Sequence, residues 1–141
     1  MCRHLDQHHV SNSPFLQFFL FRFLVFDSVF IKRHFCMPTQ TIDGVSIHTQ
    51  ANVFFEGKCI SHAITTANGT KLSVGVILPA ILTFNTGAPE VMECVAGSCE
   101  YKLEGSQDWV TSQAGEKFSV PGNSKFDIRV TAPYHYICHF G

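Results

Sequence analysis

Short alternations of apolar and polar residues, broken at close intervals by turn residues, run from Asn52 to the end of the chain. Alternation with period two is typical of half-buried β-strands. Turn signals such as Asn68-Gly69, Gly87-Ala88-Pro89 and Glu104-Gly105-Ser106 separate the runs. No helical period of useful length occurs in this region. The pattern therefore predicts an all-β antiparallel sandwich or barrel, and closure into a barrel or jelly roll removes the free strand edges of so small a protein. The expected strands cover residues 54–60, 72–78, 80–85, 91–98, 100–103, 117–120, 125–131 and 134–139.

The first quarter of the chain has a different composition. Eight of the fourteen phenylalanines lie between residues 15 and 35. Stable membrane insertion is not expected, because Arg22 and Asp27 interrupt an apolar run that is shorter than the roughly 20 residues needed to span a bilayer.

Targeting signals also fit this quarter poorly. A signal peptide would be followed by a small-residue cleavage site, and a mitochondrial presequence would carry more Arg and Ser. We expect residues 1–47 to form a poorly ordered or partly helical Phe-rich extension; the alternative for residues 1–36 is a stretch upstream of a start at Met37. Residues 48–141 are expected to form the domain.

Charge and cysteine usage narrow the function classes. The chain has 141 residues, enough for one core, and a formal net charge of −1. Nucleic-acid binding is not expected, because it requires a concentrated basic stripe. The six cysteines form no CxxC pair. We therefore expect free thiols and a reducing compartment, the cytosol.

Two short motifs lie inside the β-pattern. Glu90 is followed by Gly97, and Gly115 is followed by Pro121-Gly122. The glycines permit tight hairpins, and the proline fixes φ at the next turn. The spacing resembles the two motifs of the cupin superfamily, in which a Glu and three His surround a metal ion.

The metal-binding histidines of that pattern are missing here. Their positions fall among residues 83–86 and near Phe126, none of which is a histidine. Glu90 alone does not hold a transition metal. The resemblance therefore implies a metal-free cupin without a cofactor.

A more specific likeness is spread along the whole domain. The residues that carry it are Phe55 with Gly57-Lys58, Ser73-Val74-Gly75-Val76, Thr83-Phe84 with Thr86, Pro89-Glu90 with Met92 and Gly97, Asp108-Trp109, Ala114-Gly115 with Phe118, Val120-Pro121-Gly122 with Ser124 and Phe126, and Tyr136 with Cys138. On these residues the stretch from Asn52 to Phe140 resembles the pyrimidine/purine nucleoside phosphorylase family. The resemblance implies a homodimeric glycosyltransferase that uses phosphate to cleave many purine and pyrimidine nucleosides to the free base and α-D-ribose 1-phosphate.

Such a reaction needs donors for phosphate, stabilisation of a cationic sugar and a contact to the departing base. Strand alternation predicts a cavity whose walls stack the base. The expected lining is Phe84, Thr86, Glu90, Met92, Phe126 and Tyr136. Glu90 and Tyr136 are the predicted catalytic residues, with Glu90 at the ribose and Tyr136 at the base. The predicted phosphate donors are Lys71, Ser124 and Arg129, with Thr86 as a further one.

Each of these assignments has a structural alternative. Glu90 can instead bind backbone amides at a strand end, Phe84, Met92 and Phe126 can be plain core, and Lys71 can be a solvated hairpin residue. A second class of function, a non-catalytic metal-free cupin that binds a small metabolite, shares the fold and Glu90.

Overall fold

The computed structural model describes residues 40–141, so predictions that fall on residues 1–39 lie outside the described part. Within it the chain forms strands and one short 3₁₀ turn. The elements are β1 (Val45–Ile47), β2 (Asn52–Phe54), η1 (Phe55–Gly57), β3 (Cys59–Thr66), β4 (Lys71–Ile77), β5 (Ala80–Thr86), β6 (Glu90–Ala96), β7 (Ser98–Leu103), β8 (Val110–Gln113), β9 (Lys117–Val120), β10 (Ser124–Val130) and β11 (Tyr134–Phe140). No helix among these residues has the length and apolar character needed to cross a membrane.

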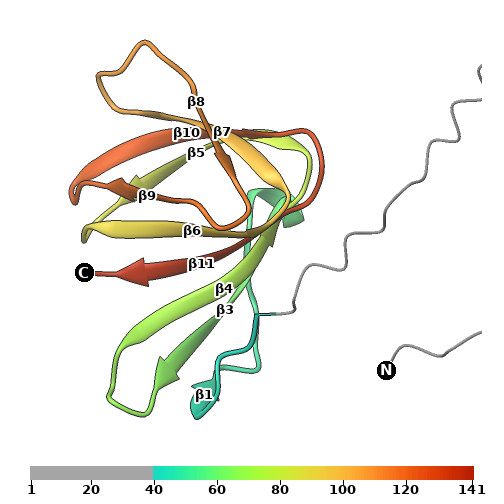
Figure 1. Ribbon diagram of the computed structural model, residues 1–141, viewed down its shortest axis with the longest axis vertical. Helices are drawn as coiled ribbons and strands as arrows, with labels where there is room; N and C mark the ends of the chain where they lie inside the picture. Colours follow the sequence, from blue (N-terminus) through green and yellow to red (C-terminus); the bar gives the residue numbers. More distant parts are fainter. Residues whose placement is uncertain (1–39) are drawn as a thin grey trace, which may run out of the picture. The chain divides into compact units, whose positions relative to one another are not determined.

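The strands form two antiparallel sheets. One has the order β1-β3-β4-β11-β6-β9, with β2 also paired to β3, and the other has the order β5-β10-β7-β8. In Figure 1, β5, β7 and β10 lie at the top of the view, and β6, β11, β4 and β3 follow below them. The expected all-β, cupin-type jelly roll is confirmed.

Strand alternation builds the core between the sheets. Phe126, Ile128 and Val130 alternate along β10 with partly exposed polar residues, and all three are buried. Tyr134 and Ile77 enter the same core from the opposite sheet. The apolar face of each strand is thus removed from water, which is the main stabilising contribution to such a fold.

The strand expected over residues 54–60 is interrupted. Phe55 and Glu56 have φ of 51° and 55°, the left-handed region, so the chain turns through η1 before β3 begins at Cys59. Alternation could not reveal this turn, because its first two residues are neither Gly nor Asn, which are the usual residues at positive φ.

Two short strands escaped the sequence pattern at other places. β8 has four residues and pairs with β7. β1 pairs with the end of β3 and precedes residue 48, where the domain was expected to begin. Strands this short show little alternation in the sequence, and pairing with a neighbouring strand stabilises them.

Gly97 shows why one predicted hairpin needs glycine. Its φ is 84°, and a Cβ atom built there would lie 2.5 Å from the carbonyl oxygen of Pro133. The turn between β6 and β7 therefore excludes any side chain at this position.

Candidate functional site

A cavity of about 250 Å³ opens between the two sheets. The seven-stranded sheet, with β2, supplies most of the wall, and β5 and β10 supply the rest. The lining residues are Asn52, Phe54, Ser61, Ala63, Ser73, Ile77, Phe84, Asn85, Glu90, Met92, Phe126, Tyr136, Cys138 and Phe140. Glu90 is the one charged side chain among them.

Register explains why these residues meet. Cys138 of β11 lies between Ser73 of β4 and Met92 of β6. β4 and β6 are both antiparallel to β11, so they run in the same direction as each other. Two residues before Ser73 on β4 is Lys71, and two residues before Met92 on β6 is Glu90, so these two lie toward the same end of the sheet. These five residues therefore share the inner face of the seven-stranded sheet.

Glu90 begins β6 and is half-buried. The thiol of Cys138 donates a hydrogen bond to its Oε2 atom at 3.6 Å. Burial raises the pKa of the Glu90 carboxyl, and this hydrogen bond opposes the shift only in part. A carboxyl group with one weak donor is available for hydrogen bonds to a ligand.

Tyr136 lies flat against the wall because residue 75 is glycine. A Cβ atom at Gly75 would lie 2.8 Å from the Tyr136 hydroxyl oxygen. The hydroxyl reaches across β4 and hydrogen-bonds the thiol of Cys59, with 3.4 Å between oxygen and sulfur. Burial raises the pKa of Tyr136 well above its ordinary value, so the phenol stays protonated.

The opposite wall is aromatic. The rings of Phe84 and Phe126 are nearly parallel, with centroids 5.4 Å apart. The ring of Phe55 from η1 makes a T-shaped contact with the Phe84 ring, with a centroid distance of 4.9 Å. The turn that interrupts the expected strand thus adds a third ring next to this wall.

Five of the predicted site residues meet at the cavity. They are Phe84, Glu90, Met92, Phe126 and Tyr136. The predicted lining residue Thr86 does not join them. Its hydroxyl donates to the carbonyl oxygen of Pro121 at 2.6 Å and accepts a hydrogen bond from the Ser124 amide at 3.2 Å. These two backbone bonds engage the side chain in joining β5 to β10.

The predicted phosphate donors lie outside the cavity lining. Arg129 is on the outer face of β10, where its guanidinium donates two hydrogen bonds to Glu100, at 2.6 and 2.7 Å, and lies 4.3 Å from the centre of the Trp109 ring. The Ser124 hydroxyl donates to Glu104 at 3.0 Å. Lys71 is exposed at the start of β4, but it shares the inner face with the lining residues.

Sequence reasoning missed the small polar residues of the lining. Ser61 and Ser73 are buried, and both face the cavity. Their positions in the alternation of β3 and β4 place them inward, on the same face as Cys59 and Ile77. Alternation along the strands therefore indicated that these two residues face inward. Sequence reasoning missed them because small polar residues are more often exposed.

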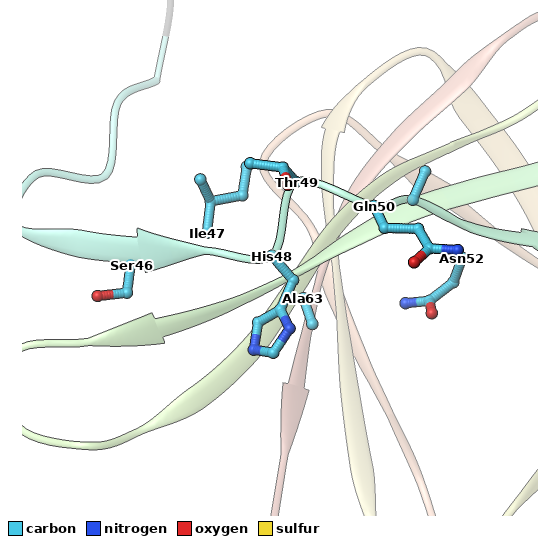
Figure 2. A pocket seen from close by; sticks show the side chains of 8 residues that line it. Ser46, Ile47, His48, Thr49, Gln50, Asn52 and Ala63 are labelled. Atoms are coloured by element: carbon cyan, nitrogen blue, oxygen red, sulfur yellow. The ribbon is translucent and has the colours of Figure 1, made fainter.

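A second hollow lies outside the core, beneath the loop from β1 to β2 (Figure 2). It is larger, about 660 Å³, and its wall includes Ser46, His48, Gln50 and Asn52. These side chains are exposed, and the hollow has no buried ionisable group. We therefore place the candidate site in the cavity between the sheets.

Within residues 40–141, no three His, Cys, Asp or Glu side chains lie close enough together to hold a metal ion. The cysteines at positions 59, 94, 99 and 138 are buried free thiols. Burial raises the pKa of Cys138 well above the ordinary thiol value, so this cavity residue is not a thiolate at neutral pH.

The chain is similar to proteins of known sequence and structure over this domain. Residues 49–140 match the family model described as pyrimidine/purine nucleoside phosphorylase. A protein of that name from Albidiferax ferrireducens is 73% identical over 105 residues, which cover 74% of this chain and 100% of the relative. One from Polaromonas naphthalenivorans is 74% identical over 107 residues and covers 74% and 99%.

Solved structures agree with this fold. A protein of unknown function from Acinetobacter sp. ADP1 is 42% identical with a TM-score of 0.71, covering 72% of this chain and 98% of that one. A putative ethanolamine utilization protein from Salmonella typhimurium is 10% identical with a TM-score of 0.51, covering 67% and 94%. The second likeness concerns the fold alone.

Proposed function

Because the chain belongs to the pyrimidine/purine nucleoside phosphorylase family, we propose that it cleaves purine and pyrimidine nucleosides with inorganic phosphate. The products are the free base and α-D-ribose 1-phosphate, which makes the protein a glycosyltransferase. The observation that carries the proposal is a cavity with one carboxyl group, Glu90, on one wall and parallel aromatic rings on the other.

The reaction gives each wall a task. A phosphate oxygen forms a bond to C1′ of the ribose while the N-glycosidic bond breaks. The electron pair of the broken bond passes to the base, which takes up a proton. Positive charge develops on the sugar in between, and an ionised Glu90 stabilises that charge or binds the ribose hydroxyls. Phe84 and Phe126 stack on the base without reading its edge.

In this proposal Tyr136 contacts the substrate but does not transfer a proton, although it carries a hydroxyl group. The phenol is protonated and already bonded to Cys59. Its ring still lines the cavity, and we assign it contact with the base or ribose rather than proton transfer.

Lys71 is the phosphate donor that the geometry favours among the three predicted. It lies on the inner face of β4, two residues before Ser73, toward the same end of the sheet as Glu90. Arg129 and Ser124 are instead engaged with Glu100 and Glu104. A Lys71→Ala variant is expected to raise the KM for phosphate about 10-fold, the loss of one charge-assisted contact, whereas Arg129→Ala leaves it within 2-fold. The reverse ranking would assign phosphate to Arg129.

We also propose a homodimer in the cytosol. An apolar groove of about 380 Å³ on the outer face of the seven-stranded sheet, lined in part by Ile42, Ile64 and Ile137, supports self-association. Buried free thiols support a reducing compartment. Sedimentation velocity on the full chain tests the first point, and a monomer at micromolar concentration would contradict it.

The test of the proposed function is a phosphorolysis assay on the full chain. Inosine and uridine are incubated with phosphate, and ribose 1-phosphate and free base are measured. Release of both products only when phosphate is present is the expected result. Binding of nucleosides without product would instead support the non-catalytic metabolite-binding alternative.

A further inference from the structure

The two oxygens of the Glu90 carboxyl group differ in their partners. Oε2 accepts a hydrogen bond from the thiol of Cys138, with 3.6 Å between sulfur and oxygen. Within residues 40–141, no other side chain or backbone amide donates to this carboxyl group. An ionised carboxylate can accept about four hydrogen bonds. One oxygen is therefore held from the wall, and most of the accepting capacity of Glu90 is left for a ligand.

Strand register places the thiol where it can hold Glu90. Phe140 of β11 lies opposite Glu90 of β6, and Cys138 precedes Phe140 by two residues. Cys138 and Glu90 are therefore diagonal neighbours on one face of the sheet. Cys138 is 3% exposed, and Ser73 and Met92 flank it on the adjacent strands. The thiol is thus an enclosed part of the wall, whereas Glu90 at the start of its strand is half-buried.

The thiol of Cys138 acts as a donor, because it stays protonated at neutral pH. Burial and the neighbouring Glu90 both raise its pKa. In return, the hydrogen bond favours the ionised form of Glu90 and opposes the rise in pKa that burial causes. A thiol is a weak donor. It can restrain the carboxylate and still leave its negative charge available to the sugar.

Few other ionisable groups face Glu90 from the elements around it. On β11 the Tyr136 hydroxyl is bonded to Cys59 of β3, and on β4 Lys71 shares the inner face. The two buried residues of β9 are apolar. The lining residues from β2, β5 and β10 carry no charge. The contact from Cys138 is therefore what distinguishes one carboxyl oxygen of Glu90 from the other.

We propose that Cys138 is a positioning residue for the reaction: its thiol holds Oε2 of Glu90 and leaves Oε1 to meet the ribose. This inference rests on the proposed function. A carboxylate held at one oxygen does not have to reorient while positive charge develops on the sugar. The proton stays on sulfur throughout, so Cys138 forms no bond to the substrate.

The kinetic experiment measures the pH dependence of kcat/KM for phosphorolysis of inosine by the full chain and its variants. Cys138→Ala removes the donor and favours protonated Glu90. Its acid limb should move to higher pH, with a loss of about 3-fold on that limb beyond the loss at the plateau, the equivalent of one weak hydrogen bond. The plateau should fall about 10-fold, because the carboxylate is no longer held. Cys138→Ser keeps a donor and should keep the acid limb at or below the wild-type pH.

Cys99→Ala is the matched control, since Cys99 is an equally buried free thiol on the other sheet. Its acid limb and plateau should match those of the wild type. Thermal melting of each variant measures lost stability, which by itself does not move an acid limb. An acid limb at the same pH in Cys138→Ala and the wild type, or an undiminished plateau in Cys138→Ala, would overturn the inference.

A second measurement does not depend on turnover. Carbon NMR titration of the Glu90 carboxyl group in the full chain, assigned by its absence in Glu90→Gln, should give a higher pKa in Cys138→Ala and the wild-type pKa in Cys99→Ala. The same pKa in Cys138→Ala and the wild type would contradict the contact. If the wild type forms no ribose 1-phosphate, the proposed function fails, and the hold of Cys138 on Glu90 stands or falls by this titration.

Discussion

Polar residues on the inner and outer faces of the two sheets differ in how many bonding partners they have. Glu90 and Glu93 belong to the same strand, yet Glu90 faces the cavity with one weak thiol donor while Glu93 on the outer face is bound by Lys117, His139 and Gln40. Arg129 on the outer face of the other sheet is likewise engaged by Glu100. These outer polar groups are engaged in ion pairs and hydrogen bonds between strands, whereas the inner carboxyl group of Glu90 is available for a ligand.

Opposite pKa shifts follow from this difference. Burial raises the pKa of Glu90. Burial also opposes the ionisation of Glu93, but hydrogen bonds from Lys117 and His139 outweigh it and lower its pKa to about 2. One strand therefore carries a carboxylate that stabilises the fold and a carboxyl group whose chemistry is free for function.

The largest expected effect comes from replacing the inner carboxyl group. Glu90→Gln is predicted to lower kcat/KM for phosphorolysis about 100-fold or more, because the stabilisation of the developing positive charge is lost. The wild-type rate should fall as the pH drops through the raised pKa of Glu90, and this acid limb should vanish in the variant. Near-normal turnover by Glu90→Gln would remove Glu90 from the mechanism.

A smaller effect is expected where the inner wall has no room. Gly75→Ala places a methyl group against the Tyr136 ring and the Ile60 carbonyl oxygen, and overpacking of this kind costs about 1–3 kcal/mol of unfolding free energy. Denaturant unfolding measures this cost. Gly87→Ala is the control, because a Cβ atom there meets nothing within 4 Å. Equal stability of the two variants would show that Tyr136 does not lie against Gly75.

The aromatic wall should affect binding rather than the chemical step. Phe84→Leu is predicted to raise the KM for nucleosides about 10-fold, since stacking on one ring is worth roughly 1–3 kcal/mol per base. Its kcat should change little. Ile81→Ala, on the outer face of the same strand, is the control. A fall in kcat with an unchanged KM would contradict the assignment of this wall to the base.

The smallest effect is expected on the outer face, and it concerns stability alone. Glu93→Gln should lower the free energy of unfolding at pH 7 by about 1 kcal/mol, after allowance for solvent screening. A lowered carboxyl pKa contributes stability above the unfolded pKa near 4.5 and loses it as the pH falls towards about 2. The difference between variant and wild type should therefore disappear over that range. A matching loss of kcat at pH 7 would break the division between the two faces.

Much of this arrangement was predictable from the sequence. Alternation assigned Glu90 and Met92, as well as Phe126, to the inner face. Turn residues located the hairpins, and Gly97 proved necessary at one of them. These features depend on neighbours along the chain, which is the information that a single sequence carries.

The remainder depends on contacts between distant strands. Arg129 finds Glu100 through the pairing of β10 with β7, and Thr86 reaches the backbone at Pro121. Both residues were expected to serve the ligand, since their side chains suit phosphate. The register that engages them joins residues 29 and 35 positions apart, which no local pattern reveals.

A crystal structure of the full chain with a bound nucleoside tests the division most directly. The base is expected beside Phe84 and Phe126, with the ribose within hydrogen-bonding distance of Glu90. A nucleoside bound only in the outer groove, or only in the hollow under the β1–β2 loop, would contradict the account.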